Sequence, residues 1–387
     1  MPKTSQNSSH DRLRRWGGSG LTASALLLLC CAAAPGGAPS GMDGSGDVVS
    51  DAASGAIVQQ LSGKSCGGGA QCYTLGVTCA GLPERRVNVR HYPVDAPRAS
   101  VVLTSGGYGT QPYEQLPVKG ETRRFLTDRE FEVFQVEWLT KKGWVAGGEG
   151  AGFEAIMCGY AAVVDWIAVH KAGNPEVMCA QGNSGGALQI AYGLSLYDLG
   201  ERLDMVILSG GPPVSRVDTY CVPPNADKLR EQMSARSGRS GSRGGRSREG
   251  RAGQTRRGRT RVPGDERFGR TSTSRGLIDE VMGWAGQGDY CSQLLPLPED
   301  ELLFAQQTSL VPPQADEARL FEFPQTKVNF VGSERDQYYQ KQGRIYFDAV
   351  GSDKAWYDIP GKPHKVDNTS EGAATIRDLM LSECRPR

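Results

Sequence analysis

Apolar runs alternate with amphipathic segments over about residues 74–220, and each has the length of one secondary-structure element. Short runs rich in Val, Ile, Phe and Tyr predict strands at 87–92, 99–104, 131–138, 176–180 and 203–208. Apolar residues recur at helical spacing over 153–170 and 184–196. Strands and helices that alternate in this way indicate an α/β fold with a mostly parallel central sheet and helices on both faces.

The alternation resumes near the C-terminus after a long interruption. Strands are predicted at 327–331 and 354–359, and a final helix at about 371–384. Residues 277–300 have the pattern of an ordered cap helix or loop. We therefore predict a core in two parts, 61–221 and 321–387, which is interrupted by an insertion over 222–320.

Within that insertion, residues 231–275 have almost no apolar side chains and carry 13 arginines against 4 acidic residues. Such a composition cannot bury enough surface to offset chain entropy, which predicts disorder. The overall net charge is only +1, so the rest of the chain is acidic. The segment is interpreted either as a tolerated surface insertion or as a loop that binds an anionic surface or polymer. Over 236–261 no aromatic residue is interleaved with the arginines, which argues against specific nucleic-acid recognition.

The N-terminal residues 1–34 have the pattern of a secretory signal peptide. Arg12, Arg14 and Arg15 precede a short apolar run over 21–34, and a flexible linker rich in Gly, Pro and Ser is predicted over 35–60. Cys30 and Cys31 lie where a bacterial lipoprotein carries its acylated cysteine, but the preceding residues do not favour lipid anchoring. The mature chain has no apolar run of transmembrane length. We expect a secreted or extracytoplasmic protein, in the bacterial periplasm or outside the cell.

Ten cysteines, eight of them beyond the signal segment, fit an oxidising compartment and predict disulfides. The sequence alone does not fix their pairing, although Cys221 and Cys291 are suited to bridge the two sides of the arginine-rich segment. No Cys-x-x-Cys pair or neighbouring histidine gives the spacing of a zinc site, so we predict no metal.

The Gly-x-Ser-x-Gly pattern of a nucleophile elbow occurs twice, around Ser184 and around Ser65. Ser184 follows a predicted strand and opens a predicted helix, which is the context that an elbow needs. Gly182 and Gly186 would let the strand and helix backbones approach closely there. Ser65 precedes Cys66 and three glycines with no helix to open, which indicates a disulfide-closed loop. Ser184 is therefore the candidate nucleophile.

A serine nucleophile needs a base, and the chain has four histidines. His10 lies in the signal segment, His91 in an early strand, and His170 at the far end of the helix before the nucleophile strand. Only His364 follows a C-terminal strand, on the edge where Ser184 emerges. The loop after strand 327–331 supplies the acid that orients the imidazole, with Asp336 as first candidate and Glu334 as the alternative.

A tetrahedral intermediate needs hydrogen-bond donors for its oxyanion. One donor is expected from the backbone N–H of Gly185, directly after the nucleophile. The glycine-rich loop that ends strand 99–104 offers the other, from Gly107 or Tyr108. Trp138 and Trp144, together with Tyr108, are candidates for the wall of an acyl pocket, although packing explains tryptophans equally well.

With these residues the chain resembles the α/β-hydrolase superfamily, over about residues 74–220 and 324–387. The matching features are the loop 105–109, the elbow 182–186, Asp336 and His364. Ser105 stands where many members carry histidine. The resemblance implies the α/β-hydrolase fold, with the insertion after the sixth strand forming a lid over the pocket.

These observations predict a secreted serine hydrolase, esterase- or lipase-like, that cleaves small-molecule, lipid or polymer esters through an acyl-enzyme without a cofactor. Two alternatives have different consequences. A catalytically silent binding protein of the same fold would grip anionic polymers through its basic loop. An acyltransferase would use the same triad but pass the acyl group to an alcohol.

Overall fold

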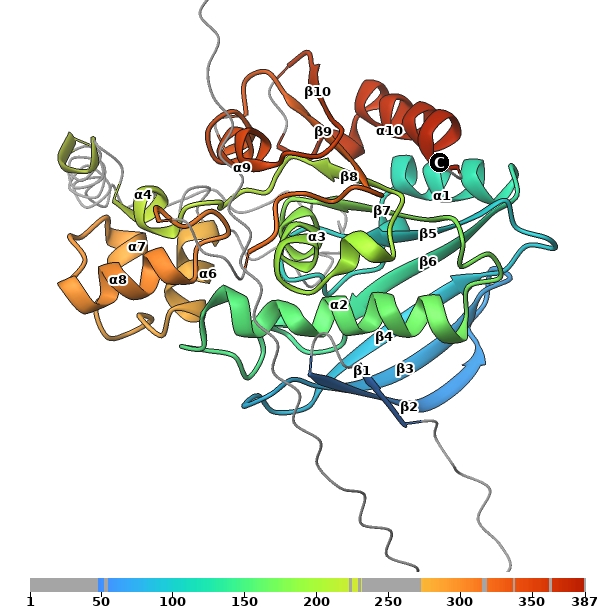
Figure 1. Ribbon diagram of the computed structural model, residues 1–387, viewed down its shortest axis with the longest axis horizontal. Helices are drawn as coiled ribbons and strands as arrows, with labels where there is room; N and C mark the ends of the chain where they lie inside the picture. Colours follow the sequence, from blue (N-terminus) through green and yellow to red (C-terminus); the bar gives the residue numbers. More distant parts are fainter. Residues whose placement is uncertain are drawn as a thin grey trace, which may run out of the picture. The chain divides into compact units, whose positions relative to one another are not determined.

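A ten-stranded sheet forms the centre of the described chain, in the order β1-β2-β3-β4-β6-β5-β7-β8-β9-β10 (Figure 1). This computed structural model describes residues 48–51, 55–222, 225–228, 231, 273–314, 319–336, 338–361 and 364–385. The strands are β1 Val48–Asp51, β2 Ala56–Ser65, β3 Gln71–Thr78, β4 Arg85–Tyr92, β5 Ala99–Thr104, β6 Phe131–Trp138, β7 Met178–Asn183, β8 Met205–Ser209, β9 Lys327–Ser333 and β10 Lys354–Ile359.

The sheet has an antiparallel half and a parallel half. Strands β1 to β4 pair antiparallel, as do β4 and β6, whereas all pairs from β6 to β10 are parallel. The carboxyl ends of the parallel strands therefore share one edge of the sheet, where open α/β sheets bind their ligands. All predicted strands are present, and 99–104, 131–138 and 354–359 match exactly.

Helices cover both faces of the sheet, as predicted (Figure 1). Helices α1 (Pro117–Thr127) and α10 (Ser370–Glu383) pack together on one face, and α2 (Gly152–His170) and α3 (Gly185–Leu196) on the other. The side chains of β5 alternate between the two sides: Val102 joins the core under α2 and α3, and Val101 and Leu103 join the opposite core. A strand buried on both faces reads as a continuous apolar run, which explains why its bounds were predictable.

The helices for which the described residues give bounds between β8 and β9 gather at one side of the sheet (Figure 1). They are α4 Val217–Cys221, α6 Thr273–Val281, α7 Tyr290–Gln293 and α8 Glu299–Gln307. The Cys221–Cys291 disulfide ties α4 to α7. Asp279 of α6 accepts backbone hydrogen bonds from Cys291 (2.8 Å) and Ser292 (2.9 Å). The insertion thus has an ordered part, whereas nearly all of the predicted disordered stretch 231–275 lies outside the described residues.

The N-terminal boundary of the fold differs from the prediction. The expected linker over 35–60 overlaps β1 and the start of β2. In β2, Ala56 and Val58 are buried while Ile57 between them is 49% exposed, which is the alternation of a strand with one face on the core and one face in solvent. The surrounding Gly, Ser and Asp residues hid this short pattern. The signal segment, Cys30 and Cys31 lie outside the described residues.

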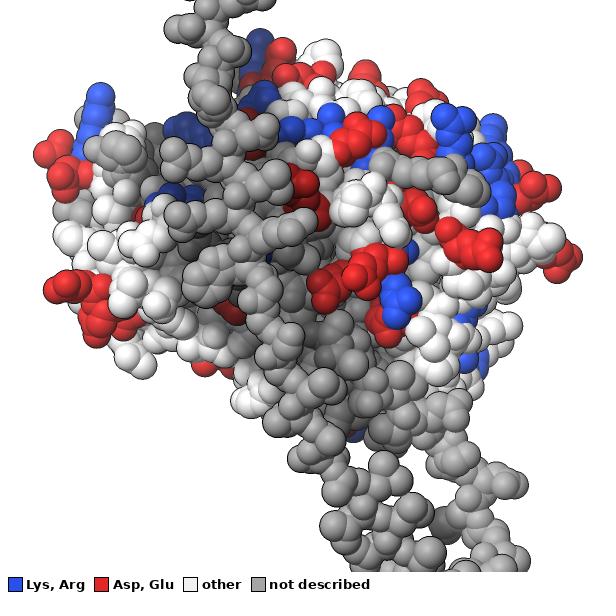
Figure 2. Space-filling model, viewed as in Figure 1, with Lys and Arg blue, Asp and Glu red and all other residues white. Residues whose placement is uncertain are grey.

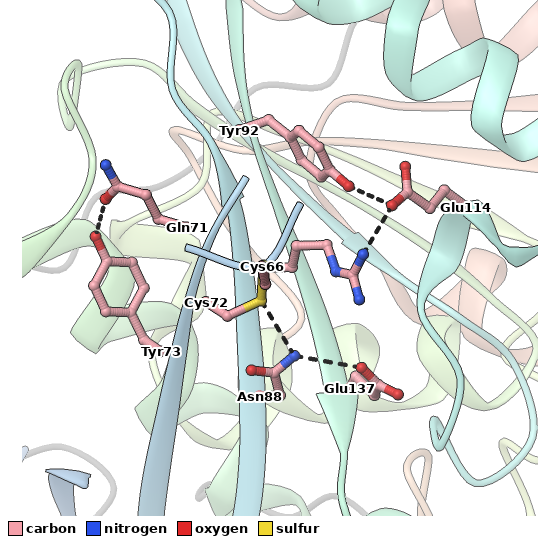
Figure 3. The surroundings of a disulfide bond; sticks show 9 residues. Cys66, Gln71, Cys72, Tyr73, Asn88, Tyr92, Glu114 and Glu137 are labelled. Carbon is pink, nitrogen blue, oxygen red and sulfur yellow. Dashed lines mark hydrogen bonds and ion pairs between the residues drawn. A yellow bond between two sulfur atoms is a disulfide. The ribbon is translucent and has the colours of Figure 1, made fainter. Parts of the chain in front are cut away.

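The eight cysteines of the described chain form four disulfides: Cys66–Cys72, Cys79–Cys158, Cys179–Cys384 and Cys221–Cys291. The first closes the turn between β2 and β3 beside the end of β2, as Figure 3 shows. Ser65 is the last residue of β2, so it lies in the disulfide-closed hairpin that the sequence indicated. Disulfides persist in oxidising compartments, and four of them indicate such an environment for this chain.

Among the described helices, α2 is long and apolar enough to cross a membrane by length and composition. However, 78% of its most apolar window is buried inside the protein, between the sheet and neighbouring helices. That burial accounts for its composition as a core helix. On the face drawn in Figure 2, acidic and basic side chains of the described residues are mixed over the region of α1 and α10.

Buried tyrosines make the fold sensitive to alkali. Burial raises the pKa of each of these phenols above its usual value of 10: Tyr113, Tyr160, Tyr192, Tyr339 and Tyr346. An unfolded chain loses these protons near pH 10 while the folded chain keeps them, so stability present below about pH 10 is lost as the pH rises further. We expect the ultraviolet absorbance of phenolate to rise in two steps, the second together with loss of circular dichroism. Complete ionisation of a chain that remains folded would contradict this.

Candidate active site

Ser184 lies at the sharp turn between β7 and α3, at the edge of the sheet where the parallel strands end. Its backbone has φ 51° and ψ −109°, an unusual conformation for a residue with a side chain. The turn is held in place by the Ser184 N–H, which donates to the Ser209 carbonyl at the end of β8 (2.9 Å). A side chain held in a strained strand-to-helix turn is the defining feature of a nucleophile elbow.

The glycines around Ser184 are required by close backbone contacts. A Cβ atom at Gly182 would lie 2.6 Å from the Gly186 carbonyl oxygen and 2.7 Å from the Ala187 nitrogen. A Cβ atom at Gly186 would lie 2.8 Å from the carbonyl oxygen of Thr104, the last residue of β5. A Cβ atom at Gly185 would overlap the Gly107 carbonyl. The elbow and the loop 105–109 therefore meet at a distance that only glycine permits.

His364 and Asp336 complete a chain of hydrogen bonds that starts at Ser184. The His364 Nε2 atom lies 2.8 Å from the Ser184 Oγ, and its Nδ1 lies 2.6 Å from the Asp336 Oδ2. When Nδ1–H donates to the carboxylate, Nε2 is left to accept the Ser184 hydroxyl proton. The three residues come from the ends of three different strands, β7, β9 and β10.

Burial and further hydrogen bonds fix the acid. The Asp336 side chain is 3% exposed, and its second oxygen accepts the Tyr338 N–H at 3.0 Å. The Tyr338 ring meets the His364 ring edge-on, with centroids 5.8 Å apart. Glu334, the alternative acid, is half-exposed and pairs with Arg335 at 3.5 Å. The structure thus places Asp336, and not Glu334, against His364.

His91 and His170 contact other parts of the protein and do not contact Ser184 or Asp336. His91 lies buried in β4, where its Nε2 is 2.7 Å from the Glu132 Oε1 and its ring stacks on Phe134. His170 is the last residue of α2. Both interpretations from the sequence agree with these positions. Among the described residues, no group of three or more His, Cys, Asp or Glu side chains is arranged to hold a metal ion.

The loop 105–109 lies against the N-terminus of α3, as expected of an oxyanion loop. Ser184 O accepts the helical hydrogen bond of Leu188 (2.9 Å), so the Gly185 N–H in the same peptide points out of the helix. Gly106 O accepts the Gly109 N–H (3.3 Å), which turns the Gly107 N–H to the opposite side of that peptide. Within the described part of the chain, the Gly107 N–H donates no hydrogen bond.

Trp138 and Trp144, candidates for the wall of an acyl pocket, are buried. Trp138 and Trp144 are each 1% exposed and lie beneath the loop 105–109, so they do not form an open wall. Tyr108 is partly buried, and its hydroxyl donates to Glu280 of α6 at 3.4 Å. Burial and the Glu280 carboxylate raise the pKa of Tyr108 to about 12, so its hydroxyl stays protonated at neutral pH.

A buried ion pair behind the histidine loop was not apparent in the sequence. Lys119 of α1 lies 2.6 Å from Asp367, and the two side chains are 6% and 0% exposed. Burial raises the pKa of Asp367, and the nearby Lys119 opposes that rise. The pair joins α1 to the chain three residues after His364. Neither residue belongs to a pattern that could have revealed it, since the contact joins positions far apart in the chain.

The strand order, the strained elbow and the Ser184–His364–Asp336 arrangement together define the α/β-hydrolase fold. In the sheet, β4 pairs antiparallel with β6, and β6 lies before β5 in the strand order. The resemblance predicted from the sequence is thereby confirmed at the level of the fold.

Comparison with known proteins finds solved structures that resemble the chain at low similarity. No family model matches the sequence, and no curated protein does. Solved structures that resemble the chain include acetyl xylan esterase 1 from Thermoanaerobacterium, with 10% identity, a TM-score of 0.46 and 88% of each chain covered. Alpha/beta hydrolase domain-containing protein 10 from mouse has 11% identity and a TM-score of 0.43, with 80% of this chain and 98% of that chain covered. Dienelactone hydrolase from Anabaena variabilis has 9% identity and a TM-score of 0.41, with 82% and 100% covered.

Proposed function

We propose that this protein is an exported serine hydrolase that cleaves acyl esters. The observation that carries the proposal is the continuous hydrogen-bond chain from the Asp336 carboxylate through His364 to the Ser184 hydroxyl, at a strained elbow. A serine hydroxyl is a weak nucleophile on its own, and an imidazole within hydrogen-bond reach activates it. Four disulfides support a chain that works outside the cytoplasm.

The reaction proceeds in two halves. Ser184 Oγ attacks the ester carbonyl while His364 Nε2 takes its proton, and Asp336 stabilises the imidazolium that forms. The N–H group of Gly185 and that of Gly107 or Tyr108 donate to the oxyanion of the tetrahedral intermediate. His364 then protonates the departing alcohol, which leaves an acyl group on Ser184. A water molecule, deprotonated by His364, attacks the acyl-enzyme and releases the acid.

Esters are the proposed substrates because they contain the less demanding leaving group. An alkoxide leaves a tetrahedral intermediate more readily than an amine anion does, and nothing in the described site adds a second acid for an amine. We propose that the insertion between β8 and β9 limits the size of the acyl group, because Glu280 of α6 accepts a hydrogen bond from Tyr108 in the loop 105–109 (3.4 Å).

Labelling with a fluorophosphonate tests the proposal, because this probe reacts covalently only with an activated serine. We expect the wild-type protein and Ser65→Ala to be labelled and Ser184→Ala to be unlabelled. Ser65 is the matched control, since it has the same Gly-x-Ser-x-Gly surroundings in the chain but lies at the end of β2. A folded wild-type protein that resists labelling would refute the proposal.

A further inference from the structure

Trp144 lies beneath the oxyanion loop and holds it by two hydrogen bonds. Its indole Nε1–H donates to the Gly107 carbonyl at 2.8 Å, and its backbone N–H donates to the Tyr108 carbonyl at 3.2 Å. The next carbonyl, Gly109, accepts the backbone N–H of Trp138 at 2.8 Å. Three successive carbonyls of the loop therefore accept hydrogen bonds from the end of β6 and from the turn that follows.

This arrangement decides which polar groups the loop presents to Ser184. Each trans peptide carries its C=O and N–H on opposite sides, so fixed carbonyls also fix the N–H groups. The loop contains Gly106, Gly107 and Gly109, and both of the last two have positive φ. Glycine gives little steric resistance to a rotated peptide, so the sequence of the loop does not itself hold it. The Gly107 carbonyl shares its peptide with the Tyr108 N–H, so a rotation of that peptide would move the Tyr108 N–H away from the oxyanion. The Tyr108 carbonyl shares its peptide with the Gly109 N–H, which donates to the Gly106 carbonyl (3.3 Å) and thereby orients the Gly107 N–H.

The turn that carries Trp144 is built for this contact. Gly143 has φ +54°, and a Cβ atom there would overlap the Tyr108 carbonyl. Trp144 is 1% exposed and packs against Phe153 of α2, with ring centroids 6.3 Å apart. Its indole has little freedom to move, which makes its N–H a rigid donor. A rigid donor under a glycine-rich loop is suited to preorganise the loop.

We propose that Trp144 is a positioning residue that holds the Gly107–Tyr108 peptide in the orientation required for oxyanion stabilisation by the Tyr108 N–H. The inference rests on the proposed hydrolase function and deepens it. The role is exerted through the loop, since Trp144 itself is buried and does not reach the substrate. A tryptophan that merely fills the core would affect stability and leave the chemical step unchanged.

Trp144→Phe tests the role, because phenylalanine keeps a buried aromatic ring and removes the N–H donor. We expect kcat for a chromogenic ester to fall by about 10- to 100-fold, since removal of a whole oxyanion donor costs about 10²- to 10³-fold. KM should stay within about twofold, because the loop acts on the transition state rather than on the ground state. Affinity for an alkyl boronic acid, which forms a tetrahedral adduct with the serine, should fall in parallel with kcat.

Trp166→Phe is the matched control. Trp166 lies near the C-terminal end of α2 and is 2% exposed in the same hydrophobic core. It contacts Tyr73 of β3 and Lys171, which follows α2, and not the loop 105–109. We expect it to lower thermal stability and to leave kcat and boronate affinity unchanged. An analogue of tryptophan with sulfur in place of the indole N–H, 3-benzothienylalanine at position 144, repeats the test with nearly the same shape if Trp144→Phe does not fold.

The outcomes separate this inference from the function on which it rests. If the wild type is labelled by the fluorophosphonate and both substitutions at 144 retain wild-type kcat, the positioning role is wrong and the hydrolase proposal stands. If the wild type is folded and unlabelled, both fall. A loss of kcat in Trp166→Phe equal to that in Trp144→Phe would also overturn the positioning role.

Discussion

Asp336→Asn is expected to lower kcat about 10⁴-fold while the protein remains folded. The carboxylate accepts Nδ1–H from His364 at 2.6 Å, which leaves Nε2 free to accept the proton of Ser184. The other carboxylate oxygen is fixed by the Tyr338 N–H, so an asparagine carbonyl placed there would direct its NH₂ group at His364. That group is a donor, and it favours the tautomer with the proton on Nε2, which cannot act as the base. Steady-state hydrolysis of a chromogenic ester measures the effect.

Glu334→Gln is the matched control for that substitution. It makes the same chemical change two residues earlier in the same loop, at a half-exposed side chain paired with Arg335. We expect kcat to stay within about twofold of the wild type, because exposed ion pairs contribute little. If Glu334→Gln lost activity and Asp336→Asn kept it, the acid would be wrongly assigned and the loop would have to move in the active protein.

The sequence alone did not decide between Asp336 and Glu334 as the acid, for a physical reason. Both follow β9 in a loop, and periodicity carries no information about the direction of a loop side chain. The choice depends on a turn in which Asp336 N–H donates to the Ser333 carbonyl (3.0 Å), which directs the carboxylate inward. Elimination worked better for the base, because only one of four histidines follows a strand at the correct edge.

The parallel strands β5 to β9 were predictable because they are buried on both faces and read as apolar runs, whereas β10 at the edge of the sheet is only half-buried. The antiparallel strands β1 to β3 were not assigned, and their polar and glycine-rich sequence explains this: the last five residues of β2 are exposed. Helix α1 was missed because its first turn contains proline and glycine, and one of its buried side chains is Lys119. That lysine is buried only because Asp367, 248 positions away in the chain by the two residue numbers, neutralises it.

For Trp144, the sequence predicted its proximity to the candidate site but not the contact that it makes. The sequence singled it out as a large aromatic residue near the candidate site, and this proximity is present in the structure. Its contact is with a backbone carbonyl of the loop, and not with an open pocket. A hydrogen bond from a side chain to a distant backbone atom has no sequence signature, so only the fold could reveal it.

Gly182→Ala is expected to destabilise the protein by about 3 kcal/mol or more, at the upper end of what overpacking costs. The new methyl group would lie 2.6 Å from the Gly186 carbonyl oxygen and 2.7 Å from the Ala187 nitrogen. Both are backbone atoms of the first turn of α3, which cannot move without shifting Ser184 away from His364. The variant should therefore unfold at lower urea concentration, and its folded fraction should also lose esterase activity.

Gly120→Ala is the control with the opposite expected sign. Gly120 lies inside α1, where a Cβ atom would be 3.5 Å from the Glu114 carbonyl oxygen, an ordinary contact. Alanine is favoured over glycine in a helix by up to about 1 kcal/mol, so this variant should be more stable than the wild type and equally active. Urea unfolding of the two variants side by side measures both effects. If Gly182→Ala were as stable as Gly120→Ala, β7 and α3 would not approach as closely as the elbow requires, and the strained turn at Ser184 would lose its structural basis.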